Sequence, residues 1–402
     1  SDEFDVQVFS NDLVFIRTSP GTMNIGPSFF FNTNGAAPNF RPFDSILVSG
    51  NGGDDTIKVY QAQTGSPTTP LDLSVRVDAG AGQDNVTVEN LHVNSLEVFT
   101  KQGRQLSTKI NNVTTENFLV AFANDIDIDN HTGNGQGTFL FGDGGQYQPA
   151  SIDVQDTETT LLHIDSAAQD TQLDVFVDRV DAGSLTVLGS NRTTLDDVLH
   201  IENTDVTGNV NINAHAGDDR VILDDLEVGG NLIVEGGTGT DTIILVRSDI
   251  DLDVRLDTTD SDTRRDTFVV NESIARSFTV DGSNGVDSVS FQNVVADDVT
   301  IGTRNGSDNV RLFNVQALDK IFTDLGSGDD TLSILLSNAT RSELRGGSDS
   351  ATGGDLLQVV DSFLGYSNLG TRVQNGFESI FDNNPGNAIF QLPRSYQLPR
   401  LY

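Results

Sequence analysis

Aspartates recur in one local setting along most of the chain, and their spacing is the feature best suited to chemistry. Each follows a glycine by two residues and precedes an apolar residue by two, as in Gly306-Ser307-Asp308-Asn309-Val310. Carboxylate oxygens repeated at a corner can hold Ca²⁺, which takes about six to eight oxygen ligands. They can equally accept hydrogen bonds from the backbone of their own turn. The column comprises Asp55, Asp84, Asp219, Asp241, Asp287, Asp308, Asp330 and Asp355.

The sequence leaves both interpretations open. For most members, an aspartate that closes its own turn is the simpler explanation, because Asp is common in turns for that reason alone. Between residues 219 and 241 acidic residues are densest, and there calcium is an equal alternative. The predicted cation ligands are Asp219, Asp241, Asp287, Asp308 and Asp330.

The spacing of these aspartates reveals an internal repeat. Asp219 and Asp241 are 22 residues apart, as are Asp308 and Asp330. Asp266 fills the longer gap after Asp241, and Asp174 and Asp197 fit the same interval upstream. Apolar residues alternate after each aspartate, which predicts strands with one face inward. The expected inward residues include Val289, Phe291, Val299, Ile301, Val310, Leu312 and Leu332.

A second polar column follows the first apolar pair of each repeat. Asn and Asp tolerate the left-handed backbone conformation, so they suit a sharp corner between strands. Stacked Asn side chains can also hydrogen-bond along the column. Its members are Asn90, Asn112, Asn130, Asp156, Asp178, Asn203, Asp225, Asn293 and Asn314.

These columns predict an all-β fold, a single right-handed parallel β-helix of about fourteen coils of roughly 22 residues. A β-sandwich would not bring the same residue type back to the same corner at a constant interval. We expect one domain. Residues 1–45 form the first coil and a capping segment, residues 46–384 the β-helix, and residues 385–402 an extended tail.

The segment Gly236-Gly237-Thr238-Gly239-Thr240-Asp241-Thr242-Ile243 resembles the calcium-binding nonapeptide of RTX proteins. That resemblance implies Ca²⁺ between successive coils. RTX repeats recur about every nine residues, however, whereas this corner recurs about every 22. The coil length over residues 46–380 instead resembles the pectate-lyase and autotransporter-like β-helices of bacterial surface proteins, which implies an extracellular location at the cell surface.

Charge and composition narrow the function classes. The chain carries 23 basic and 59 acidic residues, a net charge of −36, which disfavours nucleic acid and anionic membranes as partners. No stretch of 18 apolar residues is present, so no transmembrane segment is expected. The chain has no Cys and starts at Ser1 without a hydrophobic leader, as a secreted protein would after signal-peptide removal.

No catalytic motif stands out. The five histidines show no metal-ligand spacing, and there is no nucleophile elbow or phosphate loop. Trp is absent and only five Tyr are available as sugar platforms. We therefore expect a non-enzymatic structural protein, a filament subunit or an adhesin stalk. The rival is a polysaccharide-binding or polysaccharide-cleaving β-helix enzyme, a lyase or a glycosidase. A phage-type tail spike is less favoured because no trimerising segment is visible.

Both ends of the chain depart from the repeat and predict head-to-tail self-association. The tail doubles a Gln-Leu-Pro-Arg-x-Tyr hexapeptide and is cationic on an acidic chain. An alternative is that the tail folds back to cap its own coils. The predicted assembly residues are Arg394, Tyr396, Leu398, Arg400 and Tyr402 in the tail, with Phe29, Phe30 and Phe31 near the other end.

Overall fold

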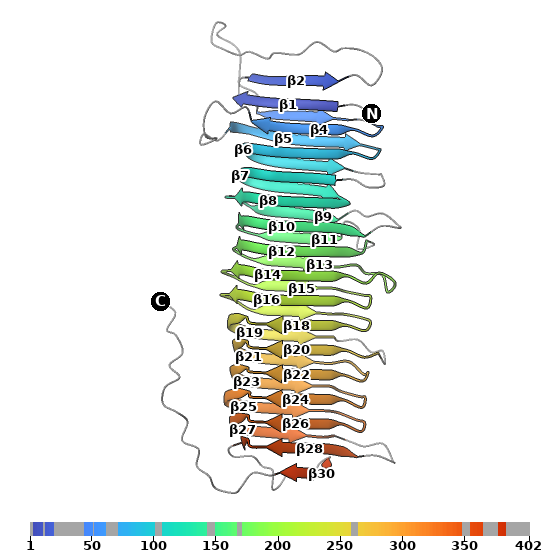
Figure 1. Ribbon diagram of the computed structural model, residues 1–402, viewed down its shortest axis with the longest axis vertical. Coiled ribbons are helices and arrows are strands. Elements are labelled where there is room, and N and C mark those ends of the chain that lie inside the picture. The colour runs from blue at the N-terminus through green and yellow to red at the C-terminus, as the bar shows by residue number, and fades with distance from the viewer. Residues whose placement is uncertain are drawn as a thin grey trace.

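Alternating apolar and polar residues place strands along almost the whole rod, and the strands stack in parallel (Figure 1). The computed structural model describes residues 3–10, 13–19, 44–50, 52–61, 71–100, 107–142, 149–166, 171–258, 264–347, 354–364 and 377–382. These residues form one parallel β-solenoid of about 12 turns of ~22 residues, with no helix. The all-β solenoid prediction is confirmed, and the expected number of coils is close.

Each coil contributes one strand to a first face, and successive strands pair in parallel register. The first-face strands are β1 (Glu3–Ser10), β4 (Thr56–Gln61), β8 (Asp125–Gly133), β10 (Ala150–Thr159), β12 (Leu173–Ala182), β14 (Val198–Val206), β16 (Arg220–Val228), β18 (Thr242–Val246), β20 (Thr267–Asn271), β22 (Ser288–Gln292), β24 (Asn309–Phe313), β26 (Thr331–Leu335), β28 (Asp355–Val360) and β30 (Phe377–Asp382).

The remaining strands complete the coils. β6 (Asn85–Thr100) and β7 (Ser107–Ala123) run through both faces. β2 (Leu13–Ser19) pairs antiparallel with β1. The return strands are β3 (Ser45–Ser49), β5 (Leu71–Gly80), β9 (Gly137–Gly142), β11 (Leu162–Ser166), β13 (Leu185–Leu188), β15 (Val210–Asn213), β17 (Leu232–Glu235), β19 (Asp249–Asp257), β21 (Ile274–Asp281), β23 (Val295–Gly302), β25 (Gln316–Asp324), β27 (Asn338–Arg345) and β29 (Phe363–Leu364).

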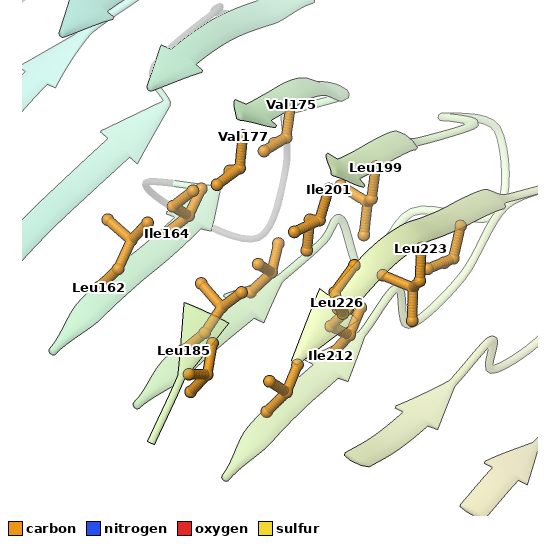
Figure 2. Packing of buried hydrophobic residues seen from close by; sticks show 14 of the residues in the cluster. Leu162, Ile164, Val175, Val177, Leu185, Leu199, Ile201, Ile212, Leu223 and Leu226 are labelled. Atoms are coloured by element: carbon orange, nitrogen blue, oxygen red, sulfur yellow. The ribbon is translucent and has the colours of Figure 1, made fainter. Parts of the chain in front are cut away.

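The interior is a continuous apolar core of Val, Ile, Leu and Ala that runs along the rod axis (Figure 2). Side chains of successive coils lie above one another, as Ile201 and Leu223 do on neighbouring strands. The seven residues predicted to point inward between 289 and 332 are all at most 1% exposed. Period-two patterning therefore located the core correctly.

The second corner also forms as expected. Asn90, Asn112 and Asn130 adopt positive φ of 51–55°, and Nδ2 of Asn112 donates to Oδ1 of Asn90 at 2.7 Å. One member is misplaced by a residue, since Arg179 takes the left-handed conformation (φ 53°) and Asp178 is buried beside it. Asn thus sets the corner without being obligatory there.

The ends were only partly predicted. β1 belongs to the stack through its parallel pairing with β4, while β2 turns back as an antiparallel strand. Residues Phe29–Phe31 and the tail 385–402 lie outside the described residues. Within the described part, no helix is long and apolar enough to cross a membrane.

Truncation of the largest buried side chains tests this core. We expect Phe291→Ala to lower the free energy of unfolding by about 3–5 kcal/mol, because Phe291 is 0% exposed and leaves a cavity. The matched control is Leu318→Ala at a 50% exposed position, where the change is expected to stay within about 0.5 kcal/mol. Chemical denaturation measures both, and equal effects would contradict this core.

Candidate functional site

The recurring aspartates form a buried column at one corner of the rod, here called the aspartate ladder, in two segments, from Asp55 to Asp84 and from Asp197 to Asp355. Within each segment, each rung is linked to the next by a hydrogen bond from its own backbone N–H to the carboxylate of the following coil. The N–H of Asp219 donates to Oδ1 of Asp241 at 2.9 Å, and that of Asp308 to Oδ1 of Asp330 at 2.8 Å. The ladder comprises Asp55, Asp84, Asp197, Asp219, Asp241, Asp266, Asp287, Asp308, Asp330 and Asp355, each at most 2% exposed.

The ladder differs from the turn-closing aspartates expected from sequence. Oδ1 accepts from the neighbouring coil rather than from its own turn. At two rungs the second oxygen accepts from its own coil: the N–H of Ser190 donates to Oδ2 of Asp197 at 2.6 Å, and that of Ser283 to Oδ2 of Asp287 at 3.0 Å. Asp197 is a rung as its spacing indicated, but Asp174 is exposed on β12 and lies outside the ladder.

Glycines at the start of the corner make room for these carboxylates. A Cβ on Gly282 would lie 2.3 Å from Oδ2 of Asp287, and one on Gly236 would lie 2.8 Å from Oδ2 of Asp241. Both distances are below van der Waals contact. The recurring Gly two residues before each aspartate has a different cause, since a Cβ on Gly306 would lie 1.7 Å from the carbonyl oxygen of Gly285 in the preceding coil.

Burial changes the ionisation of the ladder. Desolvation, reinforced by the charges of Asp197 and Asp241, raises the pKa of Asp219 to about 8. Desolvation likewise raises the pKa of Asp287 and of Asp330 to about 7. Hydrogen bonds from backbone N–H groups oppose the shift but do not cancel it. Part of the ladder is therefore in the neutral acid form near pH 7.

The predicted cation ligands lie on this ladder as two separate runs, Asp219–Asp241 and Asp287–Asp308–Asp330. Oδ2 of Asp219 and Oδ2 of Asp330 are buried and have no hydrogen-bond partner, so each offers an oxygen to a proton or a cation. The described residues hold no group of three or more His, Cys, Asp or Glu side chains arranged for a metal ion. A Ca²⁺ ion would have to draw further ligands from backbone carbonyls or water. Calcium binding stays a prediction.

Two further polar ladders were missed from the sequence. In the first of these, next to the aspartate ladder, the backbone N–H binds the carboxylate of the preceding coil rather than that of the following coil. The N–H of Asp218 donates to Oδ1 of Asp196, and that of Thr240 to Oδ1 of Asp218, both at 2.9 Å. Inside the second corner, buried serines link coils, as where the N–H of Ser337 donates to Oγ of Ser362 at 3.0 Å. The residues of both ladders recur about once per coil, and this spacing is the signal from which the sequence could have located them.

The outer face carries one aromatic row, which sequence analysis did not anticipate. Rings of Phe99, Phe122 and Phe141 stack on successive coils with centroids 5.1 and 4.3 Å apart. The Arg76 guanidinium lies 4.3 Å from the Phe99 centroid, and the His163 ring lies 6.0 Å from that of Phe141. The ring faces are thus turned toward one another along the rod.

A polar cleft of about 540 Å³ opens beside the ladder near the N-terminal end. It lies where only Asn124 separates β7 from β8, so this coil lacks the full glycine corner. Burial raises the pKa of the Asp125 carboxyl there. The lining residues are Asp54, Asp55, Thr56, Gln83, Asn85, Ser107, Asn124 and Asp125.

Comparison with protein families, with curated proteins and with solved structures finds no match to this chain. The fold is therefore established by the strand pairing itself. The likenesses to RTX corners and to bacterial surface β-helices stay at the level of sequence pattern.

The ladder predicts an unusual pH dependence. A raised folded-state pKa means that the stability due to Asp219 is complete below about pH 4 and is lost as the pH rises toward 8. We expect Asp219→Asn, which keeps an acceptor but cannot ionise, to reduce the loss of melting temperature between pH 5 and pH 8. The exposed neighbour variant Asp218→Asn serves as control. Identical pH slopes for wild type and Asp219→Asn would contradict this assignment.

The calcium prediction has a matching test. Ca²⁺ and protons compete for the same carboxylate oxygens, and a ligand that binds only the folded state raises its melting temperature. We therefore expect added Ca²⁺ to raise the melting temperature more at pH 8 than at pH 6, and chelator to reverse the gain. No change with Ca²⁺ at either pH would remove calcium from the ladder.

Proposed function

We propose that this chain is a non-enzymatic structural protein of the bacterial cell surface, a rod that serves as a filament subunit or adhesin stalk. The observation that carries this proposal is the continuous parallel pairing of the first-face strands from β1 to β30. At about 4.8 Å per coil, about 12 coils give a rod roughly 55–60 Å long. A rod of this kind transmits position and force between its two ends.

The polar side chains support this role because most of their hydrogen bonds and ion pairs among the described residues join one coil to the next. Arginines of a later coil bind aspartates of the preceding one: Nε of Arg179 lies 2.7 Å from Oδ1 of Asp156, and Nε of Arg341 lies 2.8 Å from Oδ1 of Asp319. Each pair is exposed, so solvent screening keeps its own contribution to stability small. Repeated along the rod, such pairs and the ladders resist separation of neighbouring coils.

The two ends supply the means of assembly in this proposal. Among the described strands, β2 pairs only with β1 and β30 only with β28, so both offer an open backbone edge. The cationic tail with Arg394 and Arg400 would meet the acidic surface of a second copy. A contact between unlike ends does not close on itself and propagates as a filament.

Polysaccharide binding or cleavage is the second candidate, and the polar cleft beside β7 and β8 favours it. Carboxylate and amide groups such as Asp54, Asn85 and Asp125 can hydrogen-bond sugar hydroxyls. The aromatic row favours the structural role instead, since Phe122 is stacked between Phe99 and Phe141. A sugar platform needs an open ring face. The structural function is therefore the one we propose first.

Deletion of residues 387–402 tests the assembly. We expect the full chain to form end-to-end rods or filaments under electron microscopy and the shortened chain to remain as single rods. Circular dichroism and the melting temperature of the shortened chain control for folding. If the folded, shortened protein assembles as the full chain does, the tail is not the connector.

A further inference from the structure

A histidine occupies one inward position where neighbouring coils carry apolar or hydroxyl side chains. The residue that follows the left-handed corner points into the core in successive coils, where it is Leu91, Val113, His131, Thr157 and Val180. All five are at most 2% exposed. An imidazole is therefore buried in the solenoid interior, at a position that Val113 fills in the preceding coil and Thr157 in the following one.

Both ring nitrogens of His131 have partners. Nδ1 lies 2.8 Å from the carbonyl oxygen of Val113, so Nδ1 carries the proton and donates it. Nε2 is then an acceptor, and the hydroxyl of Thr138 donates to it at 3.1 Å. Oγ1 of Thr138 lies 3.2 Å from Oγ1 of Thr159, which donates to the carbonyl of Leu161 at 3.1 Å. A chain of hydroxyls therefore connects the buried ring to the next corner.

A glycine leaves the space in which these groups meet. A Cβ on Gly133 would lie 3.0 Å from Oγ1 of Thr159, 3.2 Å from Nε2 of His131 and 3.4 Å from Oγ1 of Thr138. Gly133 has no positive φ, so backbone conformation does not require glycine here. The small residue instead leaves the three polar atoms facing a shared space inside the core.

No charged side chain faces the ring from the elements around it. The burial pattern puts their ionisable residues at outward positions, and the described residues of β9 include none. Burial without a counter-charge lowers the pKa of His131 to about 4. The outward ionisable residues are Lys109 and Glu116 on β7, Asp125, Asp127 and Asp129 on β8, Asp153, Asp156 and Glu158 on β10, and His163 and Asp165 on β11.

We propose that His131, Thr138 and Thr159 form an acid-sensitive switch: proton uptake at Nε2 places an uncompensated cation in the core and opens the coils between β7 and β11 before the rest of the rod. The hydroxyl of Thr138 can reverse its direction, so that Nε2–H donates to Thr138 and Thr138 donates to Thr159, while Thr159 continues to donate to the carbonyl of Leu161. The hydrogen bonds thus survive protonation, and the cost is that of burying a charge. This switch is independent of the proposed structural function.

The sign of the effect follows from the lowered pKa. Stability due to neutral His131 is complete above about pH 6.5 and is lost as the pH falls toward 4. The aspartate ladder has the opposite slope, so the test compares variants rather than absolute melting temperatures.

The experiment uses the full chain with His131→Val, which copies Val113 of the preceding coil, and His131→Gln, which keeps hydrogen bonding without titration. We expect wild type to lose more melting temperature between pH 6.5 and 4 than either variant does. The control His200→Gln, at a half-buried outward position, should follow wild type. Equal acid losses in wild type and both His131 variants would overturn the proposal.

Hydrogen exchange and NMR locate the event. Amide exchange in residues 107–166, corrected for intrinsic rates, is expected to accelerate at pH 4.5 before exchange in residues 171–258. The imidazole resonance lost in His131→Gln is expected to titrate near pH 4. Uniform acceleration along the rod, or titration of that resonance near pH 6.5, would also overturn the proposal.

Discussion

The constraint on which the rest of the structure depends is hydrogen bonding between neighbouring coils. Along the first face, the pairing of successive strands shows no register shift from β8 to β26. A coil cannot satisfy its backbone alone, because each strand finds its partners one coil away. Once strands are in register, corners must coincide too, and any polar group at a corner has the same group above and below it. Aspartates, asparagines, serines and phenylalanines therefore occur as ladders rather than as isolated residues.

The same constraint creates the electrostatic character of the rod. Carboxyl groups of Asp219 and Asp241 on successive rungs cannot move apart, so burial and mutual repulsion favour the neutral acid. On the outer surface, arginines relieve this repulsion by bridging to the preceding coil. In the interior, no acidic side chain faces the imidazole of His131, and burial therefore keeps it neutral. The protonation states of these groups are thus coupled to the stability of the contacts between neighbouring coils.

The sequence was sufficient to locate the features that recur once per coil. The alternation around Val289 and Phe291 and the interval between Asp308 and Asp330 were enough to place core, strands and the ladder corner. The direction of the ladder was not predictable, since an aspartate in a Gly-x-Asp corner can bind its own turn or the next coil equally well on paper. His131 was passed over because it lacks metal-ligand spacing, although its place directly after Asn130 marked it as inward. The Phe99–Phe122–Phe141 row escaped notice because these residues follow irregular intervals through β6, β7 and β9.

The donor direction of the aspartate ladder has an evolutionary consequence. Since the backbone of one rung binds the carboxylate of the next, a change that moves an aspartate out of the column would break its links to both neighbouring rungs, whereas a duplicated segment that starts and ends at equivalent rungs would join the ladder without a fault. Lineages carrying such a chain would change in length by whole coils through unequal recombination. Partial-coil changes would be confined to insertions that leave the aspartate in its column, as between Asp241 and Asp266, which are 25 residues apart and still form their rung.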